Sequence, residues 1–290
     1  MRNILKTTLF SALIALLAAC QTNATPKIPT YEGYQLFWHD EFDSEELNEQ
    51  YWDYQIGDGS PNVGWGNSEL QYYKKENVSI RDKKLVITAI KEDMRGYHYT
   101  SARIRTANKV HFKYGRVEAS IKLPDIVGMW PAFWMLPEDN YQGKWWPYNG
   151  EIDIMEARGR LNDRYSGAVH YANVGGNDEY QSFVHMLNGE GRNAKEEKTY
   201  INEFHLYSLE WDEDEMRWYF DNELVNTVKD RAWKRTLDDG STYSPFDNNE
   251  FHILLNLAVG GHFDEFREPP ESFTEAEMVV DYVRVYTYKD

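Results

Sequence analysis

The segment GEIDIMEARG, residues 150–159, places three acidic side chains in a short apolar run that has the character of a β-strand. In a regular strand successive side chains point to opposite faces, so Glu151 and Asp153 share one face and Glu156 points to the other. One extra residue in the strand, a β-bulge, returns Glu156 to the face of the first two acids, and bulges are common beside active sites. We therefore predict a bulged strand that presents three carboxyl groups on one side of a sheet.

Paired carboxyl groups of this kind suit glycoside hydrolysis, in which a retaining enzyme holds them about 5 Å apart and an inverting enzyme about 6.5–9.5 Å apart. Glu151 and Glu156 are four effective strand steps apart, roughly 13 Å between Cα atoms. The retaining distance is reached only if the two side chains lean together from a bent strand. One carboxylate must be ionised and the other protonated, and Asp153 between them can raise a pKa and share a proton.

Two other interpretations of the acid cluster are a solvent-exposed acidic strand face and a calcium site. The flanking isoleucines favour burial over exposure, and like charges on one exposed face repel each other. The apolar alternation also lacks the loop carbonyls that calcium sites usually supply.

Further segments that alternate apolar and polar residues predict an all-β chain, because this period is typical of strands with one buried face. Asp221-Asn222 is a candidate hairpin turn, and residues 187–200 are expected to form a polar loop. No long segment has helical periodicity, so the pattern predicts a sandwich or jelly roll. The clearest strands are expected at 84–90, 115–123, 151–155, 204–211, 217–225, 251–259 and 278–288.

Composition and charge narrow the class of partner. Aromatic residues make up 15% of the chain; an aromatic β core explains most of them, and aromatic rings also stack on the apolar faces of sugars. The net charge is −17 and becomes −19 once residues 1–19, with Arg2 and Lys6 and no acid, are removed. This charge argues against nucleic acid and strongly anionic polymers as partners and suits a neutral substrate, although acidity also simply favours solubility.

The N-terminus resembles a bacterial lipoprotein signal, and the alternative is an ordinary cleaved signal peptide with an incidental cysteine. A basic start precedes an apolar run that is too short to span a bilayer and ends in Leu-Ala-Ala-Cys20. Cys20 is the single cysteine, which excludes an internal disulfide. We expect residues 1–19 to be a signal peptide, residues 20–31 a lipidated cysteine and short tether, and residues 32–290 one catalytic domain. The protein is then exported and anchored by lipid to the cell envelope, at the outer membrane and with its domain exposed, with no other membrane contact.

The segment at 150–159 resembles the active-site strand of laminarinase-type glycoside hydrolases of family 16, the branch with a bulged E-x-D-x-x-E motif. Several other motifs extend this resemblance in the family's order. They are WHDEFD (38–43), GWGNSELQYY (64–73), YTSARIRT (99–106), KYGRVEASIKLP (113–124), MWPAFWMLP (129–137), HLYSLEW (205–211), ILLNLAVGG (253–261) and VDYVRVY (280–286).

The resemblance implies a β-jelly-roll sandwich of two curved antiparallel sheets with an open, concave substrate cleft. It implies retention through a covalent glycosyl-enzyme, with Glu151 as nucleophile, Glu156 as acid/base and Asp153 as assisting acid, and with no cofactor for catalysis. It also implies contacts to the glucan from Asn67, Arg103, Trp130, Trp134, Trp145, Trp146 and His170. A structural ion pair for Arg103, and core positions for His170 and the tryptophans, are the alternatives.

Many family members bind a structural calcium, and Glu41 and Asp281 resemble its carboxylate ligands, the alternative being two surface acids. The chain departs from the family in two places. His262-Phe263 stands where GNW or a close variant is common, and YQGKWWPYNG before the catalytic strand differs from the usual glycine-rich form. These departures affect the choice of glucan and not the chemistry.

We therefore expect a monomeric endo-β-1,3-glucanase that accepts laminarin-like glucan, with mixed β-1,3/1,4-glucan as a further substrate. The alternative enzyme is a hydrolase of a red-algal galactan, for which the negative charge is poorly suited. The alternatives outside catalysis are a glucan-binding protein, which would lack the carboxylates, and a structural envelope lipoprotein, which would not need them.

Overall fold

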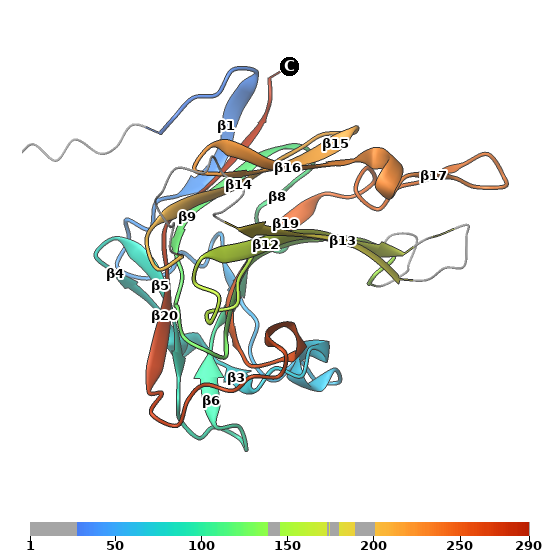
Figure 1. The fold of residues 1–290 in the computed structure, drawn as a ribbon. Coiled ribbons are helices and arrows are strands. Elements are labelled where there is room, and N and C mark those ends of the chain that lie inside the picture. Colours follow the sequence, from blue (N-terminus) through green and yellow to red (C-terminus); the bar gives the residue numbers. More distant parts are fainter. Residues whose placement is uncertain (1–27, 139–145, 173, 175–179, 189–200, 290) are drawn as a thin grey trace, which may run out of the picture. The chain divides into compact units, whose positions relative to one another are not determined.

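Two large β-sheets lie face to face in the computed structural model, which describes residues 28–138, 146–172, 174, 180–188 and 201–289 (Figure 1). Residues from Tyr31 onward form one compact unit. The predicted signal peptide and Cys20 lie outside the described residues. Within the described part of the chain, no helix is long and apolar enough to cross a membrane.

The first sheet has ten strands in the order β16-β15-β14-β9-β20-β5-β6-β3, with β1 on β20 and β4 on β5. In Figure 1 its strands β14, β15 and β16 lie above β12 and β13 of the second sheet. Its strands are β1 (Tyr34–Asp40), β3 (Gln71–Tyr73), β4 (Val78–Arg81), β5 (Lys84–Ile90), β6 (Tyr99–Ser101), β9 (Gly115–Lys122), β14 (His205–Trp211), β15 (Glu215–Phe220), β16 (Glu223–Lys229) and β20 (Glu275–Tyr288).

The second sheet has eight strands in the order β13-β12-β11-β10-β19-β7-β2, with β8 on β19. A separate two-stranded ribbon joins β17 (Arg235–Thr236) and β18 (Thr242–Tyr243). The strands of the second sheet are β2 (Asp53–Tyr54), β7 (Arg103–Arg105), β8 (His111–Phe112), β10 (Met129–Pro137), β11 (Glu151–Glu156), β12 (Arg164–Ala172), β13 (Tyr180–Asn188) and β19 (Phe251–Val259).

This architecture confirms the all-β, jelly-roll-like prediction. The helices of the described residues are short 3-10 turns: η1 (Val63–Gly66), η2 (Lys75–Asn77), η5 (Asp230–Ala232) and η6 (His262–Asp264). One strand pair departs from the antiparallel expectation, because β3 and β6 pair in parallel. The polar loop expected at 187–200 is wrong at its start, since Leu187 and Asn188 belong to β13, and residues 189–200 lie outside the described residues.

The core fills the space between the two sheets. Alternate residues of the first sheet, such as Val117, Ala119 and Ile121 on β9, are at most 1% exposed, and so are Phe133 and Met135 on β10 of the second. Such apolar layers between facing sheets are what hold a sandwich together. The remaining alternate residues of β10 and β11 therefore point to the outer face of the second sheet, which we call the site face.

The Asp221-Asn222 turn between β15 and β16 is confirmed. Both residues have positive φ angles, 47° and 65°, which is the conformation of a type I′ turn and suits the twist of a two-residue hairpin. Phe220 and Glu223 face each other across it.

Candidate active site

Strand β11 carries the predicted bulge. Opposite β12, Asp153 pairs with Ala168 and Glu156 with Ser166, so three steps on β11 face two on its neighbour. The consecutive residues Ile154 and Met155 are both buried in the core, at 1% and 0% exposure. Two successive inward side chains mark the inserted residue and reverse the alternation after it.

The bulge brings the three acids to the site face. Their neighbours on β12 are at positions 170, 168 and 166, which share one face of a regular strand. Glu151 and Glu156 also interact electrostatically with each other. The prediction that one extra residue turns Glu156 toward the other acids is confirmed.

A hydrogen bond from the opposite sheet supports the bulge. The indole N–H of Trp218, on β15, crosses the core and donates to the backbone oxygen of Asp153 at 2.9 Å. Trp218 is 1% exposed. A bulge disturbs the ladder and leaves backbone groups in need of other partners, and Trp218 supplies one.

Burial dominates the electrostatics of the three acids. The pKa of each carboxyl is raised to about 8, mainly by burial and, for Glu151 and Glu156, also by the charge of Asp153. His170 opposes these effects at both glutamates. Because the three groups are close, they titrate as one cluster, which holds fewer than three negative charges at neutral pH.

His170 faces this cluster from β12. It pairs with Glu151 in the strand register, and its Nε2 lies 3.0 Å from Asp153 Oδ2 and 3.9 Å from Glu151 Oε1. Ligand atoms of these three residues lie within 4.8 Å of one another, a spacing that could also suit a metal ion. The array equally fits proton sharing between two carboxyls and an imidazole.

Two tryptophans of β10 stand beside the acids on the same face, as predicted. Trp130 donates its indole N–H to Glu156 Oε1 at 2.9 Å, and Trp134 donates to Asn256 Oδ1 at 2.7 Å. Trp130 is only 7% exposed, whereas Trp134 is partly exposed. The exposure favours Trp134 over Trp130 as a surface for stacking on a sugar ring.

A buried arginine continues the site face beyond Trp134. The Arg103 guanidinium lies 4.4 Å from the ring centroid of Trp65 and 4.6 Å from that of Trp134. Its Nε donates to Gln55 Oε1 at 2.5 Å, and its charge lowers the pKa of Glu151. Stacking and hydrogen bonding therefore hold Arg103, and the described residues form no ion pair with it.

A hydrogen-bond chain lies next to Arg103. The buried carboxylate of Glu69 accepts from Asn67 at 3.0 Å, from Gln71 at 2.7 Å and from Tyr73 at 2.9 Å. The Tyr73 hydroxyl accepts from Asn256 at 3.2 Å. These hydrogen bonds thus connect Asn67, a predicted glucan contact, to Asn256, the hydrogen-bond partner of Trp134.

The chain resembles known enzymes in both sequence and structure. The family model for glycosyl hydrolases family 16 matches residues 61–264. The chain belongs to glycosyl hydrolase family 16. Its relatives include the glucan endo-1,3-beta-glucosidase A1 of Niallia circulans, which is 41% identical over 90% of this chain and 39% of its own length. The beta-glucanase of Rhodothermus marinus is 37% identical over 95% of this chain and 93% of its own.

Solved structures of this family agree with the fold. The laminarinase catalytic domain from Thermotoga maritima MSB8 superposes with a TM-score of 0.74 and 36% sequence identity, over 89% of this chain and all of that domain. The chain spans less than half of the Niallia circulans protein and nearly all of the Rhodothermus marinus one. Membership of a hydrolase family and three acids on one face together identify a glycoside hydrolase.

The remaining predicted glucan contacts lie before β11. Trp146 is half exposed, as a side chain at the edge of a site would be. Trp145 lies outside the described residues. Sequence reasoning did not single out Trp65, Gln55, Glu69 or Asn256, although the motif at 64–73 contains two of them and 253–261 a third.

The two predicted calcium ligands, Glu41 and Asp281, are each paired with a basic side chain. Glu41 accepts two hydrogen bonds from Arg284, both at 2.8 Å, and Asp281 lies 2.8 Å from Lys84. A cation would have to displace Arg284 and Lys84, so the arrangement does not fit calcium as it stands. The calcium site stays a prediction, and no step of the chemistry depends on it.

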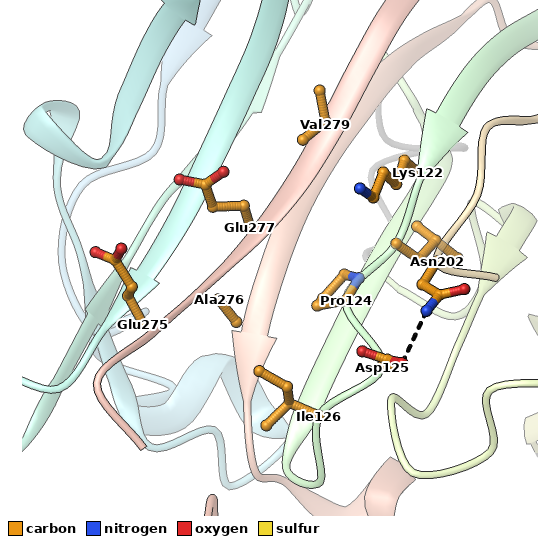
Figure 2. A pocket seen from close by; sticks show the side chains of 10 residues that line it. Lys122, Pro124, Asp125, Ile126, Asn202, Glu275, Ala276, Glu277 and Val279 are labelled. Carbon is orange, nitrogen blue, oxygen red and sulfur yellow. Dashed lines mark hydrogen bonds between the residues drawn. The ribbon is translucent and has the colours of Figure 1, made fainter. Parts of the chain in front are cut away.

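A hollow of about 430 Å³ lies beside the paired ends of β9 and β20 in the first sheet, and none of the three acids of β11 lines it. Figure 2 shows the side chains that line it. Asn202 donates to Asp125 at 2.9 Å at its rim. Its described lining has no aromatic side chain that could stack on a sugar. The lining consists of Lys122, Leu123, Pro124, Asp125, Ile126, Asn202, Glu275, Ala276, Glu277 and Val279.

Proposed function

We propose that this protein is a retaining endo-glycoside hydrolase of β-1,3-glucan, laminarin-like, with mixed β-1,3/1,4-glucan as a further substrate. The observation that carries the proposal is the bulge in β11, which places Glu151, Asp153 and Glu156 on one face. The substrate class is supported by relatives named as β-1,3-glucan hydrolases.

The two glutamates divide the chemistry. Glu151 attacks the anomeric carbon while Glu156 gives its proton to the glycosidic oxygen, so that the bond to the leaving sugar breaks and a glycosyl-enzyme ester forms. Water, deprotonated by Glu156, then attacks the same carbon and frees Glu151. Two inversions retain the β configuration.

Asp153 and His170 help to keep the nucleophile Glu151 ionised. Glu151 must be ionised to attack, yet burial raises its pKa to about 8. A proton held by Asp153, whose charge acts on Glu151, leaves the negative charge on the nucleophile. The contact of His170 Nε2 with Asp153 Oδ2 at 3.0 Å keeps this carboxyl in place.

The neutral sugar binds along the outer face of the second sheet. Trp134 and Arg103 lie on β10 and β7, which flank β19, and they offer a ring face and a fixed cation for hydroxyl groups. A glucan is favoured over a galactan because the relatives of higher identity are named as glucan hydrolases.

The test is the release of reducing ends from laminarin, lichenan, agarose and carrageenan by the wild type and by Glu151→Gln. We expect laminarin cleavage, with lichenan second, and a loss of at least about 1,000-fold in Glu151→Gln. Proton NMR of the first product should show the β anomer. An α anomer at first turnover, or cleavage of the galactans alone, would contradict the proposal.

The N-terminal sequence supports a second part of the proposal, export and lipid anchoring at Cys20. Metabolic labelling with a fatty-acid analogue should mark the wild type and leave Cys20→Ser unlabelled. Labelling of both would remove Cys20 from the proposal without affecting the hydrolase.

A further inference from the structure

Trp130 has an unusual position for a tryptophan at a sugar site, because its ring is covered. Phe263 stacks on it, with ring centroids 4.9 Å apart and an interplanar angle of 21°. On Gly261, which has a φ of +81°, an added Cβ would lie 3.0 Å from the Trp130 ring. The ring is therefore confined while its N–H donates to Glu156.

The loop that covers Trp130 is itself held firmly. The Asp264 carboxylate, fully buried, accepts from Arg160 at 2.8 Å and from the backbone N–H of Gly128 at 3.1 Å. The Arg158 guanidinium lies 4.6 Å from the Phe263 ring centroid. These contacts join the loop to residues just before β10 and just after β11, the two strands that carry Trp130 and Glu156.

We propose that Phe263 is a positioning residue for Glu156 and acts through Trp130. The stacked ring prevents Trp130 from turning, and this keeps the indole N–H aimed at Glu156 Oε1. The inference rests on the proposed role of Glu156 as the acid/base, and it assigns a purpose to Phe263.

Other groups that face Glu156 stay in place when Phe263 changes. They are Asp153 and Glu151 from its own strand, His170 from β12 and Arg158 from the loop after β11, while the exposed His262 has its ring centroid 5.8 Å from that of Trp130. The hydrogen bond from Trp130 favours the ionised carboxylate and lowers the pKa of Glu156. Loss of that bond therefore raises this pKa, and the general acid keeps its proton to higher pH.

The experiment compares Phe263→Leu, Trp130→Phe and the double variant on laminarin, with kcat/KM measured across pH. Trp130→Phe should move the basic limb of the pH profile of kcat/KM to higher pH by about one unit. This shift corresponds to the free energy of one hydrogen bond to a charged group. Phe263→Leu should move the limb in the same direction and lower kcat about 10-fold, with KM changed less than about 2-fold. In the double variant, Phe263→Leu should add nothing to Trp130→Phe.

Phe263→Trp keeps an aromatic stack and should restore the wild-type limb. Phe266→Leu is the matched control, because Phe266 is in the same region and 67% exposed, and it should leave the profile unchanged. A Phe263→Leu enzyme with raised KM and an unmoved limb would mean that Phe263 contacts the sugar, and additive effects in the double variant would also overturn the proposal. If Glu156→Gln itself hydrolyses laminarin normally, the assigned role of Glu156 fails, which is a separate outcome.

Discussion

The hydrogen bond from Trp218 to the backbone of Asp153 is a point where the two sheets depend on each other, and it can be tested directly. Trp218→Phe keeps an aromatic ring and removes the N–H that reaches Asp153 O at 2.9 Å. The carbonyl is then left buried at the bulge without this donor. An unsatisfied buried group of this kind costs about 1–3 kcal/mol of the free energy of unfolding.

A matched control separates this hydrogen bond from the smaller ring. Trp211, on the neighbouring strand β14, is 1% exposed like Trp218, and its indole N–H has no hydrogen-bond partner among the described residues. Trp211→Phe shrinks a core ring by the same amount without breaking a bond. Because Trp211→Phe also removes an unpaired buried N–H, the difference between the two variants should be at least the cost of the orphaned carbonyl, about 1–3 kcal/mol.

Urea denaturation followed by circular dichroism measures the two free energies, and thermal melts should place Trp218→Phe about 2–12 °C below Trp211→Phe. We also expect kcat of Trp218→Phe to fall about 10-fold, because a looser bulge misplaces Asp153 and Glu156. If the two variants were equally stable, Trp218 would merely fill space, and the account of how the bulge is held would be wrong.

Three further perturbations follow from the same geometry. Gly167→Ala places a Cβ 2.5 Å from the Trp218 ring, so urea denaturation should show a loss of about 1–3 kcal/mol from overpacking. Arg103→Lys loses the flat group that stacks on two rings, so KM for laminarin should rise about 10-fold with a smaller change in kcat, as steady-state kinetics would show. Burial raises the pKa of Glu151 to about 8, so the folded state binds the extra proton and its stability falls as pH rises from about 4.5 to 8. Glu151→Gln removes this loss, and its stability relative to the wild type should be higher at pH 8 than at pH 5 by about 3 kcal/mol, with an equal difference at both pH values as the contradicting result.

Much of the fold and the site centre was predictable because the signals are local. The alternation in 84–90 and 251–259 matches β5 and β19 at both ends, since each of these strands contributes a continuous row to the core. The bulge could be predicted because three acids in an apolar strand can share a face only if the alternation is broken once. The Asp-Asn turn carries its own conformational preference for positive φ.

What the sequence did not show depends on contacts between distant segments. Strand β12 contains a central glycine and little apolar alternation, and it was not among the predicted strands. The glycine is explained only by the ring of Trp218, which comes from the other sheet and leaves no room for a Cβ. The covering of Trp130 by Phe263 likewise joins residues 133 positions apart in sequence, which no local pattern can show.

The metal prediction is limited for the same reason, because the contacts that bear on it join segments far apart in the sequence. Glu41 and Asp281 were considered as a pair because the family pattern places acids there, but their cationic neighbours come from elsewhere along the chain. Arg284 holds Glu41 with two hydrogen bonds, and Lys84 lies on β5, adjacent to β20, beside Asp281. The neutralising charges are found only when the strand order is known.

Function and stability are opposed within one strand. The inward residues Ile152, Ile154 and Met155 are at most 1% exposed and anchor β11 in the core, while the outward acids are desolvated enough for burial to raise their pKa. A buried, mutually repelling cluster is unfavourable, so the strand would be more stable without it. The inserted residue resolves the conflict in space, because it adds a second inward apolar side chain at the same position where it turns Glu156 outward. The stabilising contact of Met155 and the reactive position of Glu156 are therefore two consequences of one irregularity in the backbone.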